Sequence, residues 1–238
     1  MLRRALIAIA AIAGIAVTTS LGLWQWGRGE RRTALHDAVV AQEQSGAVDV
    51  RDVLAARADD PRLLHRPVVL RGQWLPERTV YLDNRQMNGV PGFYVVTPLR
   101  VEGSQSVILV QRGWVQRDFE RRDRLPPVQT PAGEVEVRGR LSPPPAKLYA
   151  FSTEEKGTIR QNLDLAAFRA ETGLPLQPVS VQQTGRPSEG LLRQWPEAGS
   201  GAEKNYGYAF QWWAMAALIA ILYVWFQFIL PRRAPRRA

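Results

Sequence analysis

Two long runs without a charged residue lie at opposite ends of the chain and dominate its hydropathy pattern. They are residues 5–26, ALIAIAAIAGIAVTTSLGLWQW, and residues 206–230, YGYAFQWWAMAALIAILYVWFQFIL. An apolar helix of about 22 residues reaches about 33 Å, enough to cross a bilayer core of about 30 Å. Aromatic residues gather at both ends of the second run, as is typical of membrane interfaces. The pattern predicts two transmembrane helices.

Basic residues flank both runs and predict their orientation. Arg3 and Arg4 precede the first run, and Arg232, Arg233, Arg236 and Arg237 follow the second. Such residues are normally held on the cytoplasmic side. We therefore expect five parts: a cytoplasmic N-terminus (1–4), a span (5–26), an outer domain (27–205), a second span (206–230) and a basic cytoplasmic tail (231–238).

The first run is also compatible with a cleaved signal peptide, since it has a basic start and an alanine-rich core. Its length and the closing residues Trp24 and Trp26 favour an uncleaved anchor. No Arg- and Ser-rich presequence precedes it, which favours a bacterial inner membrane over a mitochondrial one.

Small residues recur every four positions in the first run, at Ala10, Gly14, Thr18 and Gly22. Such a stripe lets two helix backbones approach closely. Its partner could be the second run, which offers Ala216 and Ala220, or a client membrane protein. Chance spacing in an alanine-rich helix is an equally open explanation.

Between the runs the periodicity changes. Residues 28–44 have charges on one side and apolar residues on the other, which predicts a helix that continues the first span into water. From residue 66 to 141 the period is two, typical of β-strands; Val68, Leu70 and Trp74 alternate with Val69, Arg71 and Gln73. We expect strands at 79–83, 93–99, 106–115, 134–141 and 177–182, and a short helix at 163–171.

The resulting fold class is α+β: a mainly antiparallel, β-rich domain, as a sheet or partial barrel, flanked by N- and C-terminal transmembrane helices. Asn88-Gly89 and Pro91-Gly92 fit the loop between the second and third strands. Asp164 suits the first turn of the short helix, and Gly173 suits its end.

The charge and the cysteine and histidine counts reduce the range of functions to consider. The net charge is +9, but the terminal arginines supply six of these charges, so the excess marks membrane topology rather than a nucleic-acid surface. The chain has no cysteine and two histidines, His36 and His65, which excludes thiolate sites and argues against a metal centre within one chain. No partner nucleic acid and no metal site are expected.

No catalytic motif occurs, and we do not expect an enzyme. Two arginine motifs remain. Arg85 follows Asp83-Asn84 at a strand end, and Arg112-Gly113-Trp114 places a cation beside a small gap and a large ring. These arginines could hold a propionate or a partner's carboxylate. The structural alternative, that each arginine ties a strand to a neighbouring loop, is the favoured one.

Taken together, these features resemble the SURF1 family (Shy1 in yeast) of cytochrome c oxidase assembly factors. The first motif is Leu21-Gly22-Leu23-Trp24-Gln25-Trp26-Gly27-Arg28, similar to the family's LGxWQxxR signature. The others are Arg85, Gly89, Gly92 and Thr97-Pro98-Leu99, then Val110-Gln111-Arg112-Gly113-Trp114-Val115, and finally Tyr208-Ala209-Phe210-Gln211-Trp212-Trp213. The resemblance covers nearly the whole chain, and the order of the motifs is more specific than any one of them.

The resemblance implies a non-enzymatic role in maturing a haem-copper oxidase, by assisting haem A insertion into the catalytic subunit or by holding that subunit ready. Its expected partners are that subunit, haem A synthase and membrane lipid, with haem A handled transiently. Some bacterial relatives are thought to bind haem through a histidine just before the second span, where this chain has Asn205. Tyr206, Tyr208 and Trp212 are the haem-proximal candidates here.

The remaining motif residues are expected to serve a partner contact or the fold itself: Gly22, Trp24, Gln25, Arg28, Arg85, Arg112, Gly113, Trp114 and Gln211. Two alternatives to haem A insertion stay open. One is a membrane-anchored scaffold for oxidase subunits that binds no haem, and the more remote one is a membrane-anchored hydrolase.

Overall fold

The computed structural model describes residues 2–55, 57, 60–121, 124–145, 148, 157–196, 199 and 201–233. These residues form two compact units. The helix pair comprises residues 1–38 and 197–238, and the β domain comprises residues 39–196. Met1 and most of the predicted basic tail, beyond Arg233, lie outside the described residues.

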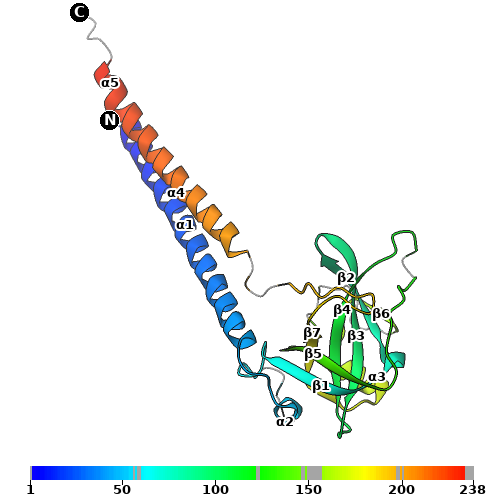
Figure 1. Cartoon of the computed structure of the whole chain (residues 1–238). Coiled ribbons are helices and arrows are strands. Elements are labelled where there is room, and N and C mark those ends of the chain that lie inside the picture. The colour runs from blue at the N-terminus through cyan, green and yellow to red at the C-terminus, as the bar shows by residue number, and fades with distance from the viewer. Residues whose placement is uncertain are drawn as a thin grey trace, which may run out of the picture. The chain divides into compact units, whose positions relative to one another are not determined.

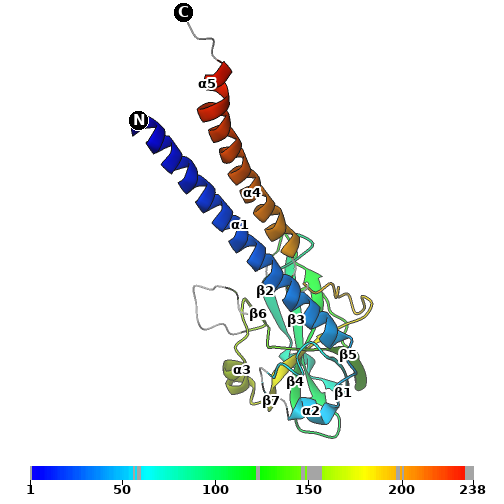
Figure 2. The same cartoon turned by 90° about the vertical axis from the view of Figure 1, so that its left-hand side faces the viewer.

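Two helices run side by side in the helix pair (Figures 1 and 2). Helix α1 spans Leu2–Glu43, so the predicted membrane run and the predicted helix at 28–44 form one continuous element. Helix α4 spans Ala202–Val224 and continues through a π-helical turn, η2 (Trp225–Ile229), into α5 (Leu230–Arg233). Both helices are long and apolar enough to cross a membrane, as expected from their charge-free runs.

Within its described residues, the β domain contains seven strands and three short helical elements. In chain order they are α2 (Val50–Leu54), β1 (Pro67–Trp74), η1 (Pro76–Arg78), β2 (Val80–Met87), β3 (Val90–Val101), β4 (Val107–Gln116), β5 (Glu134–Ser142), β6 (Ile159–Arg160), α3 (Leu165–Thr172) and β7 (Leu176–Gln183). The predicted strands and the predicted short helix are all present. Asp164 caps the start of α3 by accepting hydrogen bonds from Ala166 and Ala167, and Gly173 ends it in the left-handed conformation.

Strand pairing closes into a ring, which makes the core of the domain a five-stranded barrel. The order is β1-β5-β7-β4-β3, and β3 returns to β1 through pairs such as Gly72↔Val101. A Cβ atom at Gly72 would overlap the carbonyl group of Arg100, so glycine permits this close approach. Strands β2 and β6 extend the sheet beyond β3. The closed ring leaves few free edges, which limits edge-to-edge association.

One detail of the sequence-based prediction was wrong, the placement of Pro91-Gly92 in the loop between the second and third strands. The hairpin between β2 and β3 is only the two-residue turn Asn88-Gly89, with φ of 53° and 78°, because Asn-Gly tolerates the positive φ values of a tight turn. Pro91 and Gly92 therefore belong to β3 and not to the loop. The sheet is mainly antiparallel, as predicted, and its two parallel pairs among the described residues are β4–β7 and β2–β6.

Alternating side chains fill the barrel. Val68, Leu70 and Trp74 of β1 are buried, while the residues between them are exposed except Gly72. They pack with residues from the other strands of the ring, including Ile108, Val110, Leu141 and Val181. A second cluster lies under α3 around Phe168 and Leu109.

Strand β4 has apolar neighbours on both faces, and its residues 107–114 are all buried. The middle of β4 is thus a place where a polar side chain must find a partner.

Candidate functional site

Small residues of α1 face bulky side chains of α4 along the seam of the helix pair. Gly14 lies against Ile219, a Cβ atom at Gly22 would overlap the indole of Trp213, and Gly29 faces the ring of Tyr206. Thr18 and Ala216 are buried in the same seam. The stripe of small residues therefore contacts the second helix of the same chain, one of the two partners considered from the sequence.

Aromatic rings cluster where the seam leaves the apolar run of α1. The ring of Trp26 lies 4.8 Å from that of Tyr206 and 5.7 Å from that of Trp213, centroid to centroid. The Tyr206 hydroxyl is 3.2 Å from Oγ1 of Thr33. Such tilted ring pairs add stability beyond their apolar burial. This cluster joins Trp26 of the first family motif to Trp213 of the last one.

A polar pair lies beside these rings. Nδ2 of Asn205 donates a hydrogen bond of 2.7 Å to Oε1 of Gln25. Asn205 is 7% exposed, and its Oδ1 has no hydrogen-bond partner among the described residues. Interhelical amide hydrogen bonds stabilise helix pairs where water is scarce. The residue at the position of the expected haem-ligating histidine is therefore used to join the two helices.

The other predicted residues of this region lie apart from that polar pair. Tyr208 is 53% exposed and Gln211 is exposed, whereas Trp212 is half-buried. The Arg28 guanidinium stacks over the ring of Trp24 at 5.5 Å, on an exposed part of α1. These side chains are accessible to lipid or to a partner protein.

The cluster does not fit axial ligation of haem iron. The chain's two histidines are elsewhere, Asn205 is an amide bonded to Gln25, and the Tyr206 hydroxyl is bonded to Thr33. Tyr208 is the phenol left accessible, but no second ligand lies with it among the described residues. Across the described part of the chain, no group of three or more His, Asp or Glu side chains could hold a metal ion.

The motif Arg112-Gly113-Trp114 lies at a β-bulge in strand β4 of the barrel. Opposite β3, Gln111 pairs with Val96 and Gly113 pairs with Val95, so Arg112 is an extra residue in β4. The first arginine motif has the same feature, since the β2–β3 register shifts between Leu82 and Arg85. β-Bulges re-aim a side chain and are common near functional sites.

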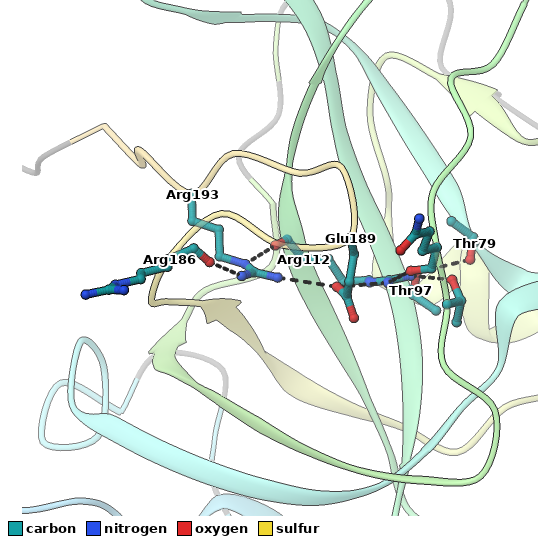
Figure 3. A network of polar contacts seen from close by, with 8 residues as sticks. Thr79, Thr97, Arg112, Arg186, Glu189 and Arg193 are labelled. Carbon is teal, nitrogen blue, oxygen red and sulfur yellow. Dashed lines mark hydrogen bonds and ion pairs between the residues drawn. The ribbon is translucent and has the colours of Figure 1, made fainter.

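Arg112 is completely buried and is held by a dense set of contacts (Figure 3). Its Nη1 donates to Oγ1 of Thr130 at 2.7 Å, and its Nη2 donates to the carbonyl oxygen of Gln129 at 2.6 Å. Its Nη2 also lies 3.0 Å from the Glu189 carboxylate, and its guanidinium stacks over Trp74 at 4.8 Å. The ring beside this cation thus belongs to β1 and not to the adjacent Trp114.

Glu189 belongs to a segment, residues 184–196, that we call the strap. Arg193 of the strap donates from Nε to the carbonyl oxygen of Arg112 at 2.9 Å, and its Nη2 lies 3.3 Å from Glu189 (Figure 3). Trp114 and Leu192 exchange two backbone hydrogen bonds. Burial, with a smaller effect of the Arg112 charge, lowers the pKa of Arg193, while Glu189 opposes this shift.

Gly113 makes the close packing of the strap possible. A Cβ atom there would lie 2.6 Å from the carbonyl oxygen of Leu192 and 2.8 Å from Cβ of Leu191. The motif Arg112-Gly113-Trp114 therefore binds the strap in three ways: by charge, by close approach and by backbone hydrogen bonds.

Arg85 is also engaged within the domain. Its Nη2 donates to the carbonyl oxygen of Gln161 at 3.0 Å, and its guanidinium lies over the ring of Tyr94 at 5.8 Å. Its own carbonyl oxygen accepts a hydrogen bond of 2.8 Å from the Trp114 indole. Tyr94 in turn packs edge-on against Trp195 of the strap, 5.0 Å between centroids. Both arginines thus have the tying geometry that the structural alternative predicted.

Sequence reasoning missed Glu189 and Arg193, because residues 186–204 look like a Gly-, Pro- and Ser-containing connection. The one available signal was the opposite charge of two residues four positions apart. It also missed the contact of Gln25 with Asn205, which no local pattern indicates.

Comparison with known proteins agrees with the motif order. The model of the SURF1 family matches residues 12–217. A SURF1-like protein of Rickettsia prowazekii (strain Madrid E) is 25% identical over 216 residues, which cover 87% of this chain and 84% of the relative. A SURF1-like protein of Rickettsia bellii (strain RML369-C) is 24% identical over 211 residues, 85% of this chain and 83% of the relative. A SURF1-like protein of Drosophila melanogaster is 27% identical over 177 residues, 66% of this chain and 56% of the relative.

The seam of the helix pair can be tested with two glycines of the same motif. We expect Gly22→Ala to destabilise the pair by about 1–3 kcal/mol, because the added methyl group overlaps the Trp213 indole. Gly27→Ala is the matched control, since no atom lies within 4 Å of its added Cβ. Thermal unfolding of the intact protein in detergent, followed by tryptophan fluorescence, measures the difference. Equal melting temperatures for the two variants would contradict the described seam.

The strap anchor can be tested with two arginines that each pair with a glutamate. We expect Arg112→Met to lower the melting temperature by about 6–12 °C, because removing one partner of a buried pair costs about 3 kcal/mol. Arg138→Met is the control: that arginine's side chain is 76% exposed beside Glu136, and such surface pairs contribute little. The idea fails if both substitutions have the same small effect.

Proposed function

The chain belongs to the SURF1 family, and from this we propose that it is an assembly factor for a haem-copper oxidase, acting without catalysis of its own. Within this role we propose that it assists the insertion of haem A into the catalytic subunit. The observation that carries the proposal is the extent of the family match, residues 12–217, which takes in parts of both long helices and the whole β domain.

We propose that haem A is cargo and that this chain does not supply an iron ligand. Asn205 and Tyr206 are committed to contacts between the helices, which supports this restriction. The contribution of the chain is then to hold the catalytic subunit in a form that accepts haem A. An aromatic cluster at the end of an apolar helix pair suits contact with a membrane-embedded client, because such rings have affinity for the headgroup level.

The proposed partners are the oxidase catalytic subunit, haem A synthase and membrane lipid. Outward-facing residues of both helices support contact within the bilayer: Ile9, Ile12, Phe210, Leu218 and Ile221 are all more than half exposed. A helix that presents apolar residues on its outer side requires lipid or another membrane helix. The more polar β domain is the part available to extramembrane portions of the same partners.

We further propose that the protein lies in a bacterial inner membrane, with both termini in the cytoplasm and the β domain in the periplasm. The two apolar helices support two spans. Arginines at positions 3 and 4 and in the tail support the orientation.

The assembly role is tested by deleting the gene in the native host. We expect the purified oxidase to lose most of its haem A, measured as pyridine haemochrome per oxidase, while b- and c-type cytochromes elsewhere in the membrane keep their normal amounts. Complementation with the wild-type gene should restore haem A. An oxidase with a full haem A complement in the deletion strain would overturn the proposal.

A separate experiment tests the proposal that this chain supplies no ligand to the iron of haem A. Protein purified from cells that make haem A should show no haem A spectrum in stoichiometric amount. A stable, stoichiometric haem A complex would identify a carrier instead, even if the deletion result holds.

Topology is tested with a reporter inserted at Gly103, in the exposed turn between β3 and β4. A reporter that is active only in the cytoplasm should give no signal there, while the same reporter fused after Ala238 should be active. A strong signal at Gly103 would contradict the orientation.

A further inference from the structure

A polar cavity lies in the wall of the β domain beside the buried arginine. Its volume is about 430 Å³, and its lining comes from segments that are far apart in the sequence. The lining residues are Pro76, Glu77, Thr79, Tyr81, Arg112, Val128, Thr130 and Thr158. A cavity of this size is in the range of small-molecule sites. Nothing in the proposed assembly role assigns it a ligand.

Hydroxyl groups dominate the lining, and the network around Arg112 sets the direction of one of them. Oγ1 of Thr130 accepts a hydrogen bond of 2.7 Å from Nη1 of Arg112. Because the arginine can only donate, the Thr130 proton points away from it and is available to another acceptor. Tyr81 adds a phenol; burial raises its pKa, although the Arg112 charge opposes the rise, so this hydroxyl keeps its proton at neutral pH.

The charge behind the cavity is positive on balance. The side chains of Arg112 and Arg193 are 0% and 4% exposed and both pair with one carboxylate, that of Glu189, so these three residues together carry one net positive charge. Nε of Arg112 is buried and has no partner among the described residues. The acidic residue of the lining is Glu77, which is exposed at the rim and screened by water. An anion in the cavity would meet donors at short range and a favourable field from a region of low dielectric.

Arg112 itself is covered, since its exposed fraction is 0%. It therefore acts on a ligand through its field and through Thr130, while Tyr81 and Thr158 provide direct contact. Thr79 has a different role, because its hydroxyl is 3.0 Å from that of Thr97. The hydroxyls of Tyr81, Thr130 and Thr158 are thus neutral donors that line the cavity beside a fixed positive charge.

From this arrangement we propose that the cavity is a binding site for a small oxyanion, with a carboxylate or phosphate group held by the hydroxyls of Tyr81, Thr130 and Thr158. Carboxylate and phosphate share the acceptor chemistry that these donors recognise. The site is independent of the proposed assembly role and would exist whether or not the client is an oxidase.

The test uses the intact protein in detergent and two probes, sodium succinate and sodium phosphate, in isothermal titration at constant ionic strength. We expect at least one probe to bind with a Kd below about 1 mM. Tyr81→Phe keeps the ring that packs 6.0 Å from Phe93 and removes only the donor, so it should weaken binding about tenfold. Thr158→Val, at the exposed rim, should weaken it in the same direction.

Thr184→Val is the matched control, because Thr184 is an exposed threonine that does not line the cavity. It should bind as the wild type does, and all three variants should melt within a few degrees of the wild type. Binding of succinate alone identifies a carboxylate ligand, and binding of phosphate alone identifies a phosphate ligand. The proposal is overturned if neither probe binds more tightly than chloride, or if Tyr81→Phe and Thr158→Val both bind like Thr184→Val.

Discussion

The buried guanidinium of Arg112 is the constraint on which the β domain depends. A charge with no exposure must be compensated, because its desolvation costs several kcal/mol. Glu189, Gln129, Thr130 and the face of Trp74 supply that compensation. They come from the strap, from the segment before β5 and from β1. One side chain therefore fixes the relative positions of three parts of the chain that are far apart in sequence.

The contacts of Arg112 also hold the strap, which is the last part of the β domain in the sequence before α4. Gly113 lets the strap lie against β4, and Tyr94 and Trp195 extend the contact towards Arg85. Both arginines sit at register shifts in the sheet, where an ordinary strand would have continued its alternation. In this domain the two bulges direct the side chains of Arg85 and Arg112 into the interior. The buried charge of Arg112 also gives the adjacent cavity its proposed preference for anions.

In the helix pair, close packing and one amide hydrogen bond, and not a buried charge, hold distant parts of the chain together. Its seam joins glycines to aromatic rings, and the amide pair Gln25–Asn205 adds one directional bond. Four residues of the family motifs, Gly22, Gln25, Trp26 and Trp213, thereby make contacts between the two helices. Residues left for lipid or a client, such as Trp24, Tyr208 and Gln211, are those on the outer faces of the helices.

Local patterns in the sequence determined both apolar helices, every main strand of the barrel, the caps of α3 and the order of the family motifs. These features depend on neighbours within a few positions, through periodicity, capping and turn chemistry. Only the tertiary structure decided that Arg112 pairs with Glu189, that Asn205 bonds to Gln25 across 180 positions, that β3 closes the ring onto β1, and that a cavity opens beside Thr130. Such contacts produce no periodic pattern in the sequence, because the packing of the folded chain selects the two partners and their separation in the sequence does not.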